Sequence, residues 1–234
     1  MSCEWRWLSG PGVGDEPALN MAIDQAIFEA HAEGIAPPTI RVYEWEAPVV
    51  TIGRLQSAEA ARAAFPGLTC IRRPTGGRAV LHGDDLTISV VVREDLIRSC
   101  LAKRGILASY HLLLEAVVKT VAEYGVCLDQ GSDRRREARS EDCFERVASC
   151  DLVERATGQK ALGSAQLRRG GAILQQMSLR PLQKVQILGS EFQSCLRHNF
   201  KDVLGIDRWL ENGLTPREQI RARAIVREEM VAEP

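Results

Sequence analysis

Residues 72–82 read RRPTGGRAVLH, from Arg72 to His82, and an alternating apolar segment, LTISVVV, follows at 86–92. The alternation predicts a strand at 86–92, beside the glycine pair. Adjacent glycines let backbone N–H groups approach an anionic or acyl ligand closely, and arginine adds a planar fork of donors suited to phosphate or carboxylate. The stretch therefore predicts a binding site. Taken alone, it leaves open a Gly-Gly hairpin turn with solvated arginines.

A second cluster of glycines with a cation lies at 158–168, where the chain reads GQKALGSAQLR. Lys160 stands there among small residues, which leave room for a ligand chain to lie against the backbone. Two short motifs precede this segment, Asp142-Cys143-Phe144 and Asp151-Leu152-Val153. The ordinary alternative for Lys160 is an exposed lysine on a strand.

The apolar pattern predicts one α+β domain. Strands are expected at 5–8, 39–45, 49–53, 69–72, 86–92, 150–155, 160–167 and 171–179. Helices are expected at 19–34, 58–65, 107–124, 182–188, 190–199, 203–210 and 216–230. We expect 39–45 and 49–53 to be sheet neighbours, the last three strands to form an antiparallel meander, and 129–142 to be a polar loop. Gly125 and Thr215 have the residue types of helix caps.

Composition limits the kinds of partner that the chain can have. The 234 residues are 45% hydrophobic and carry a formal net charge of -1, so a large core is expected but no global field that would attract nucleic acid. No apolar run approaches the roughly 18 to 20 residues needed to cross a bilayer, and the first residues show no signal-peptide pattern. We therefore expect a cytoplasmic protein with no membrane or nucleic-acid partner. The seven cysteines show no CxxC pair and no zinc-type histidine spacing, so no metal site is expected.

The arginine-glycine run and the lysine motif, in this order, resemble the lipoate ligase and octanoyltransferase family, which shares the biotin/lipoate protein ligase catalytic domain. The resemblance extends from Asn20-Met21-Ala22 to Met177-Ser178-Leu179. It implies a single catalytic domain with a mostly antiparallel central sheet flanked by helices. We expect the catalytic core at 1–181 and a short helical tail at 182–234 packed on the same domain.

The order Cys143-Phe144, Asp151-Leu152-Val153 and Gly158-Gln159-Lys160 is similar to that of the cysteine-dependent octanoyltransferases. That resemblance implies that Cys143 carries an acyl-thioester intermediate and that Lys160 favours its thiolate and orients the acyl carbonyl. A cysteine that accepts an acyl group needs a nearby cation or oriented donors to become a thiolate. Cys150 is the competing thiol, and the motif fits Cys143 better. Both thiols being incidental is the remaining alternative.

The same resemblance implies a set of residues around the substrate. The turn and its flanks would border the acyl pocket and the carrier's phosphopantetheine or phosphate group, and Ser164 would offer its hydroxyl to the acyl head. His82 is expected to orient the loop, with a purely structural role as the alternative. The expected substrate-binding residues are Arg72, Arg73, Thr75, Gly76, Gly77, Arg78, Ala79, His82, Gly163, Ser164 and Ala165.

The resemblance implies an octanoyltransferase that needs no cofactor. It would move octanoyl from acyl carrier protein to the lysine of a lipoyl domain or of the glycine-cleavage H protein. A lipoate ligase catalytic subunit using ATP and Mg²⁺, with Lys160 binding the adenylate, and an amidotransferase between lipoyl domains are alternatives. The short tail after Pro181 favours the transferase over ligases with a further C-terminal domain.

Two features leave other interpretations open. Gln176-Met177 stand where the family commonly has His-Gly, and this departure puts the acyl preference in doubt. It is also the only support for a noncatalytic module that binds acyl carrier protein or a lipoyl domain. The arginines 134–136 could steer acidic carrier or lipoyl domains by charge, with a solvated loop as the alternative.

Overall fold

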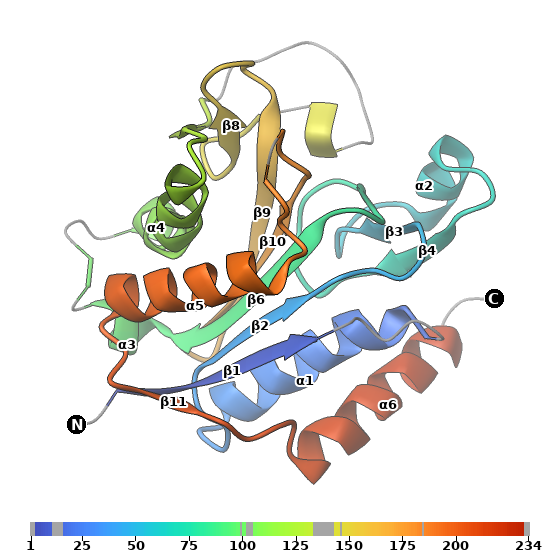
Figure 1. The fold of residues 1–234 in the computed structure, drawn as a ribbon. Coiled ribbons are helices and arrows are strands. Elements are labelled where there is room, and N and C mark those ends of the chain that lie inside the picture. Colours follow the sequence, from blue (N-terminus) through green and yellow to red (C-terminus); the bar gives the residue numbers. More distant parts are fainter. Residues whose placement is uncertain are drawn as a thin grey trace.

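The computed structural model describes residues 3–10, 16–98, 100–101, 105–132, 143–145, 147–183 and 185–231. Among them, eight strands form one central sheet (Figure 1). Their order across the sheet is β11 (Arg208–Leu210), β1 (Glu4–Gly10), β2 (Thr39–Tyr43), β6 (Leu86–Arg93), β10 (Ala172–Leu179), β9 (Lys160–Arg169), β8 (Leu152–Glu154) and β7 (Leu128–Gln130). From β2 to β7 every neighbouring pair is antiparallel, whereas β1 runs parallel to β2 and β11. The prediction of a mostly antiparallel sheet with a β8-β9-β10 meander is confirmed.

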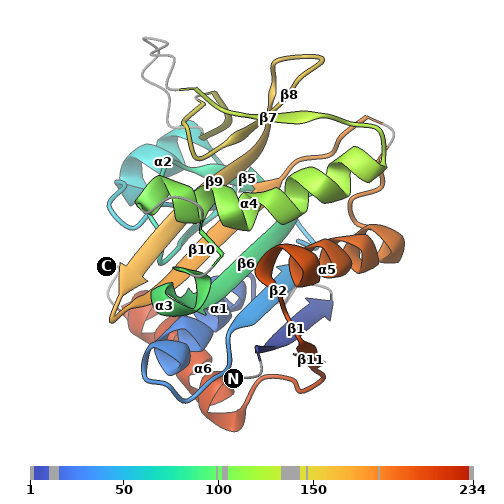
Figure 2. The same cartoon turned by 90° about the vertical axis from the view of Figure 1, so that its left-hand side faces the viewer.

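Helices cover both faces of this sheet (Figures 1 and 2). On one face lie α3 (Glu94–Arg98), α4 (Ile106–Glu123) and α5 (Ser190–Leu204); on the other lie α1 (Ala18–Ala32) and α6 (Pro216–Val231). Strand β10 contributes side chains to the hydrophobic core on each face of the sheet, because its side chains alternate between the two faces. Ile173 and Leu179 pack with the α4 and α5 side, and Leu174 packs with the α1 and α6 side.

A smaller sheet stands beside the upper end of the central one in Figure 1. It has the order β4 (Thr69–Arg72), β3 (Val49–Ile52), β5 (Val80–His82), and α2 (Ala58–Ala64) accompanies it. The expectation that 39–45 and 49–53 are sheet neighbours is therefore wrong. The chain leaves β2 at Tyr43, and buried Trp45 and Val49 pack at the junction, so β3 begins a separate sheet.

The glycine turn is not a hairpin. Strand β4 precedes Gly76-Gly77 as expected, but the turn leads into the unexpected strand β5 before the expected strand at 86–92. Strand β3 lies between β4 and β5, parallel to β4 and antiparallel to β5. The turn therefore crosses over the end of β3 toward β9 and β10, where the candidate site lies.

Two expected C-terminal helices are absent from the described residues. Residues 182–183 and 185–188 form turns with a bridge between Leu182 and Val185, whose apolar side chains reach the core at a spacing that imitates a helix. Helix α5 runs on to Leu204 and ends at Gly205, which has a left-handed φ of +60°. Strand β11 follows in place of the expected helix at 203–210. The short elements β5, α3 and β7 were not expected from the sequence.

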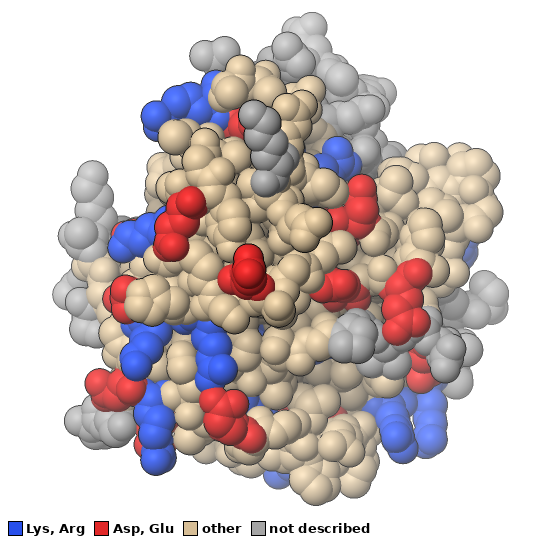
Figure 3. Space-filling view, viewed as in Figure 1, with Lys and Arg blue, Asp and Glu red and all other residues tan. Residues whose placement is uncertain are grey.

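Helix α6 begins with reciprocal hydrogen bonds between Thr215 and Glu218, so the predicted Thr215 cap is confirmed. The Glu218 N–H donates to Thr215 Oγ1 at 3.2 Å, and the Thr215 N–H donates to Glu218 Oε2 at 2.7 Å. No helix in the described part of the chain is long and apolar enough to cross a membrane. On the face drawn in Figure 3, basic and acidic side chains are interspersed, in keeping with the small net charge.

Candidate active site

A cysteine and a lysine from different elements meet beside the glycine turn. Cys143 opens the 3-10 turn η1 (Cys143–Glu145), and Lys160 is the first residue of β9. The Lys160 ammonium donates to Cys143 Sγ at 3.1 Å and to the Cys143 carbonyl at 2.9 Å. The same Nζ lies 2.8 Å from Asp151 Oδ2. The structure thus brings together the two residues expected to be catalytic.

Burial strengthens the electrostatic interactions within this cluster. The Lys160 and Asp151 side chains are 2% and 4% exposed. Burial alone would lower the pKa of Lys160, but the facing Cys143 and Asp151 outweigh it and raise that pKa above its usual value. Lys160 therefore stays an ammonium at neutral pH, and a cation in contact with sulfur favours the thiolate of Cys143.

The competing thiol, Cys150, is in the opposite environment. Its Sγ lies 3.7 Å from the Ser164 carbonyl oxygen, toward which an S–H donates and a thiolate would be repelled. Burial, and then the negative charge of Asp151, raise the pKa of Cys150 to about 11. At neutral pH Cys150 is a thiol, so the geometry favours Cys143 as the nucleophile.

Neighbouring residues hold Cys143 in place. Its backbone N–H donates to the carbonyl of Ala79 in the glycine turn at 2.7 Å. The Arg180 guanidinium lies 3.5 Å from the centre of the Phe144 ring, and Lys160 Nζ lies 5.2 Å from it. Phe144, which the sequence motif singled out, therefore anchors η1 between two cations.

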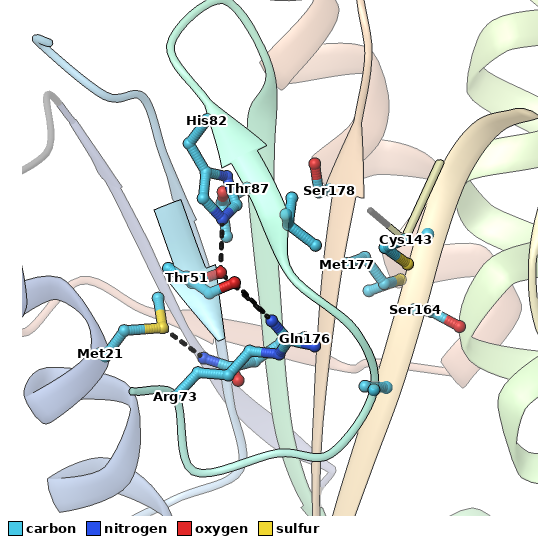
Figure 4. A pocket seen from close by; sticks show the side chains of 14 residues that line it. Met21, Thr51, Arg73, His82, Thr87, Cys143, Ser164, Gln176, Met177 and Ser178 are labelled. Atoms are coloured by element: carbon cyan, nitrogen blue, oxygen red, sulfur yellow. Dashed lines mark hydrogen bonds between the residues drawn. The ribbon is translucent and has the colours of Figure 1, made fainter. Parts of the chain in front are cut away.

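A pocket opens beside Cys143 (Figure 4), with Cys143 and Met21 at opposite sides in that view. Its lining comes from α1, both sheets, the glycine turn and η1. The lining residues are Met21, Thr51, Arg73, Gly77, Val80, His82, Thr87, Cys143, Gly163, Ser164, Ala165, Gln176, Met177 and Ser178.

Six of the residues expected to bind substrate line this pocket, and five do not. The six are Arg73, Gly77, His82, Gly163, Ser164 and Ala165. The five are Arg72, Thr75, Gly76, Arg78 and Ala79. Arg72 instead donates to the carbonyls of Gly53, Arg54 and Gln56, so it braces the segment after β3.

Arg73 shapes the glycine turn from inside. Its guanidinium donates to the carbonyls of Thr51 at 3.0 Å, Gly76 at 2.7 Å and Arg78 at 2.7 Å. Burial lowers the pKa of Arg73 to about 10, while a negative charge on Cys143 acts in the other direction. Arg73 therefore remains a cation and adds to the positive field at Cys143.

His82 lies in a closed polar network. Its Nε2 is 2.8 Å from Thr51 Oγ1, its Nδ1 is 2.8 Å from Asp85 Oδ2, and its ring stacks on Trp45 with 4.5 Å between centroids. Ser178 also donates to Asp85 Oδ2. This network fixes the loop after β5, whereas the loop that His82 was expected to orient is the glycine turn at 75–79.

The Ser164 hydroxyl does not face the pocket. It donates to the Cys150 carbonyl and points away from the other lining side chains in Figure 4. The expectation that this hydroxyl meets the acyl head is therefore wrong. Ser164 pairs with Met177 on β10, whose side chain packs in the core on the α4 side of the sheet. Ser164 therefore borders the pocket while its hydroxyl is turned to the Cys150 carbonyl.

Several site residues were not predicted from the sequence. Asp151 was part of a motif but received no role, although it contacts Lys160. Gln176 was noted only as a departure from the family pattern. Its side chain donates to Asp24 Oδ2 on α1 and accepts from Thr75 Oγ1 in the glycine turn, so it ties both to β10. Met21 on α1 and Thr51 on β3 gave no sequence signal, because they reach the pocket only through tertiary packing.

The arginines 134–136 lie outside the described residues. Within the described residues, no cluster of three or more histidine, cysteine or acidic side chains could hold a metal ion.

A family model and curated relatives match most of the chain. The family model described as "Lipoyl protein ligase A/B catalytic domain" matches residues 16–202. Octanoyltransferase LipM of Moorella thermoacetica is 41% identical over 182 residues, which are 75% of this chain and 64% of that protein. Octanoyltransferase LipM of Symbiobacterium thermophilum is 39% identical over 76% of this chain and 66% of its own length. The chain thus spans about two thirds of the length of these curated relatives.

Solved structures share the fold at low sequence identity. A lipoate-protein ligase A with bound ATP superimposes with a TM-score of 0.74 at 23% identity, covering 100% of this chain and 97% of that one. A bipartite lipoate protein ligase of Thermoplasma acidophilum, from a study with its E2 lipoyl domain, gives a TM-score of 0.70 at 22% identity, covering 100% and 95%. With the family model covering most of the sequence, the chain belongs to the lipoyl protein ligase A/B catalytic domain family.

Proposed function

We propose that this protein is an octanoyltransferase that carries the acyl group on Cys143. The observation that supports this most is the buried Lys160 ammonium 3.1 Å from Cys143 Sγ, beside a pocket. Relatives at 33–41% identity are named octanoyltransferase LipM. The donor is octanoyl-acyl carrier protein, and the acceptor is a lysine of a lipoyl domain or of the glycine-cleavage H protein.

The first half-reaction loads the enzyme. The Cys143 thiolate attacks the thioester carbonyl of the donor, a bond forms between that carbon and Cys143 Sγ, and the bond to the donor's sulfur breaks. Lys160 gives the leaving thiolate a proton and becomes a neutral amine. The carrier then departs as a free thiol, and Cys143 holds the octanoyl group.

The second half-reaction transfers the octanoyl group from Cys143 to the acceptor. The amine of the acceptor lysine attacks the Cys143 thioester, a C–N bond forms, and Cys143 leaves as a thiolate. Neutral Lys160 takes the proton released from the attacking nitrogen, which restores the starting ammonium and thiolate. Because the donor thioester supplies the free energy, this route needs neither ATP nor Mg²⁺.

The pocket suits an acyl chain although many of its lining residues are polar. The side chains of Thr51, His82, Gln176 and Ser178 are hydrogen-bonded to protein groups. Polar atoms satisfied in this way do not require water or a polar ligand. Met21 and Val80 add apolar surface. We infer that the octanoyl chain runs from Cys143 toward Met21.

Arg78 is the residue of the turn best suited to meet the donor's anionic arm. Its Nη1 is buried and has no hydrogen-bond partner among the described residues. It directly precedes Ala79, which holds the Cys143 backbone. An arginine next to the nucleophile with a spare N–H fits a phosphate or carbonyl oxygen of the phosphopantetheine.

Intact-protein mass spectrometry tests the function. The protein is mixed with octanoyl-carrier protein without ATP, with Cys143→Ala and Cys150→Ala in parallel. We expect an octanoyl adduct that hydroxylamine removes and that only Cys143→Ala abolishes. Transfer that requires ATP and free acid would instead show a ligase, loading from an octanoylated H protein alone would show an amidotransferase, and no transfer under any condition would show a binding module.

A further inference from the structure

The carboxylate of Asp151 contacts Lys160, which in turn contacts Cys143, and its charge also acts on Cys150. Its Oδ2 contacts Lys160 Nζ at 2.8 Å and accepts from the Ala148 N–H at 2.7 Å. Its Oδ1 accepts from the Ser164 N–H at 3.2 Å. Both oxygens are thus fixed by donors, and the residue is 3% exposed. A carboxylate held this firmly fixes the group that it contacts.

Ser164 connects this carboxylate to Cys150. The Ser164 N–H faces Asp151, its carbonyl faces the Cys150 thiol at 3.7 Å, and its hydroxyl donates to the Cys150 carbonyl. Among the described residues, Tyr110 on α4 also interacts with Cys150, and burial raises its pKa to about 12, so it stays neutral. The negative charge near Cys150 therefore comes from Asp151, and the positive charge from Lys160.

We propose that Asp151 is a positioning residue that holds the Lys160 ammonium against Cys143 and keeps Cys150 a thiol, so that the acyl group is loaded on Cys143 alone. Lys160 faces both thiols electrostatically, and a cation by itself would activate either of them. Asp151 removes this ambiguity, because its charge opposes a second anion at Cys150 while its oxygen directs Nζ toward Cys143. This selectivity rests on the proposed function.

Asp151→Asn removes the charge and leaves the size nearly unchanged. An amide has one acceptor oxygen, so in either orientation its NH₂ group faces a donor, from Ser164 or from Ala148 and Lys160. Lys160 then loses its anchor, and Cys150 loses the anion that opposes its ionisation. Both changes reduce the preference for Cys143.

Alkylation with iodoacetamide between pH 6 and pH 10, followed by peptide mapping, measures this preference directly. We expect Asp151→Asn to raise the reactivity of Cys150 relative to Cys143 about tenfold, which corresponds to a shift of about one pH unit. In the transfer assay kcat falls about tenfold with the KM for octanoyl-carrier protein unchanged, and an octanoyl adduct forms on Cys150. Asp129→Asn is the matched control, since it breaks an exposed pair between β7 and Arg155, which follows β8, and should change none of these values.

Asp151→Glu keeps the charge and moves it by one methylene. It should leave Cys150 unreactive while kcat still falls, and it provides the test if Asp151→Asn does not fold. A folded Asp151→Asn with unchanged relative alkylation of the two thiols and unchanged kcat overturns the proposal. Alkylation needs no acyl substrate, so a wild-type protein that never takes octanoyl on Cys143 would refute the proposed function while the alkylation ratio still decides the role of Asp151.

Discussion

Gly53 lies directly against the carbonyl of Gly77. A Cβ built on Gly53 would stand 2.1 Å from the Gly77 oxygen and 3.0 Å from the Gly77 carbonyl carbon. Gly77 itself has a φ of +94°, and a Cβ there would meet Arg73 Nη2 at 2.7 Å. The glycine turn therefore closes over the end of β3 only because both positions lack a side chain. This contact brings the turn to Cys143 through Ala79.

Gly53→Ala should displace the glycine turn, because neither backbone segment has a flexible end that could give way. We expect a loss of roughly 2 kcal/mol or more in the free energy of unfolding, measured by urea denaturation. Gly10→Ala is the control, since a Cβ there has nothing within 4 Å. Equal stability of the two variants would contradict this account of the turn.

Gly163→Ala should separate the reactive pair without unfolding the protein. The new Cβ would lie 3.4 Å from Cys143 Sγ and 3.2 Å from Lys160 Cε, so the flexible lysine must shift. We expect kcat for octanoyl transfer to fall about tenfold, because small misplacements of reacting groups are costly. The melting temperature should stay close to that of the wild type. A variant that keeps full kcat would show that the contact between Sγ and Nζ does not matter.

Lys160→Met should leave Cys143 without its cation. The sulfur then loses the ammonium that it contacts, so alkylation of Cys143 by iodoacetamide at pH 7 should slow about tenfold or more. Lys119→Met, which breaks a half-exposed pair with Glu115 on α4, is the matched control. If both variants react as fast as the wild type, Lys160 does not activate the thiol.

Local patterns in the sequence predicted most elements of the fold. The alternation in β6 and β10, the left-handed glycine at Gly125 and the cap at Thr215 each depend on a few neighbouring residues. Sheet partners depend on distant ones. The sequence of β3, VVTI, suits a fully buried strand and predicts one. It does not predict that this strand joins β4 and β5.

The C-terminal errors have a similar cause. Strand β11 is three residues long, too short to show a period, and it exists because it pairs with β1. Gly205 could have signalled the end of α5, since a glycine after an apolar repeat is a common helix stop. The helical spacing of the apolar residues on both sides of Gly205 nevertheless led to the prediction of a helix at 203–210.

The site was predicted by residue type and order, and its geometry was not. The motifs identified Cys143 and Lys160, but the contact between Asp151 and Lys160 follows from the pairing of β8 with β9. That pairing has a register irregularity at Leu152 and Val153, which no spacing in the sequence reveals. Likewise, the direction of the Ser164 hydroxyl, toward the Cys150 carbonyl, depends on the pairing of β9 with β10 and β8.

A buried ion pair joins the C-terminal helix to β1. Arg6 donates to Glu218 at 2.6 and 2.8 Å, and both side chains are 0% exposed. Burial alone would raise the pKa of Glu218, but the bonds from Arg6 and Thr215 outweigh it and lower that pKa below its usual value. A carboxyl with a lowered pKa contributes stability above its unfolded pKa of about 4.3, and this is lost as the pH falls through the lower folded value.

Glu218→Gln should therefore destabilise the protein by about 3 kcal/mol at pH 7, because the Arg6 charge stays buried without its counterion. The difference from the wild type should shrink as the pH falls below about 4, since the wild-type carboxyl then becomes neutral as well. Urea denaturation at pH 7 and at about pH 3.5 measures both values. Glu211→Gln, which removes an exposed partner of Arg197, should cost less than about 1 kcal/mol at either pH. A Glu218→Gln deficit that is equally large at both pH values would mean that lost packing, and not the ion pair, accounts for it.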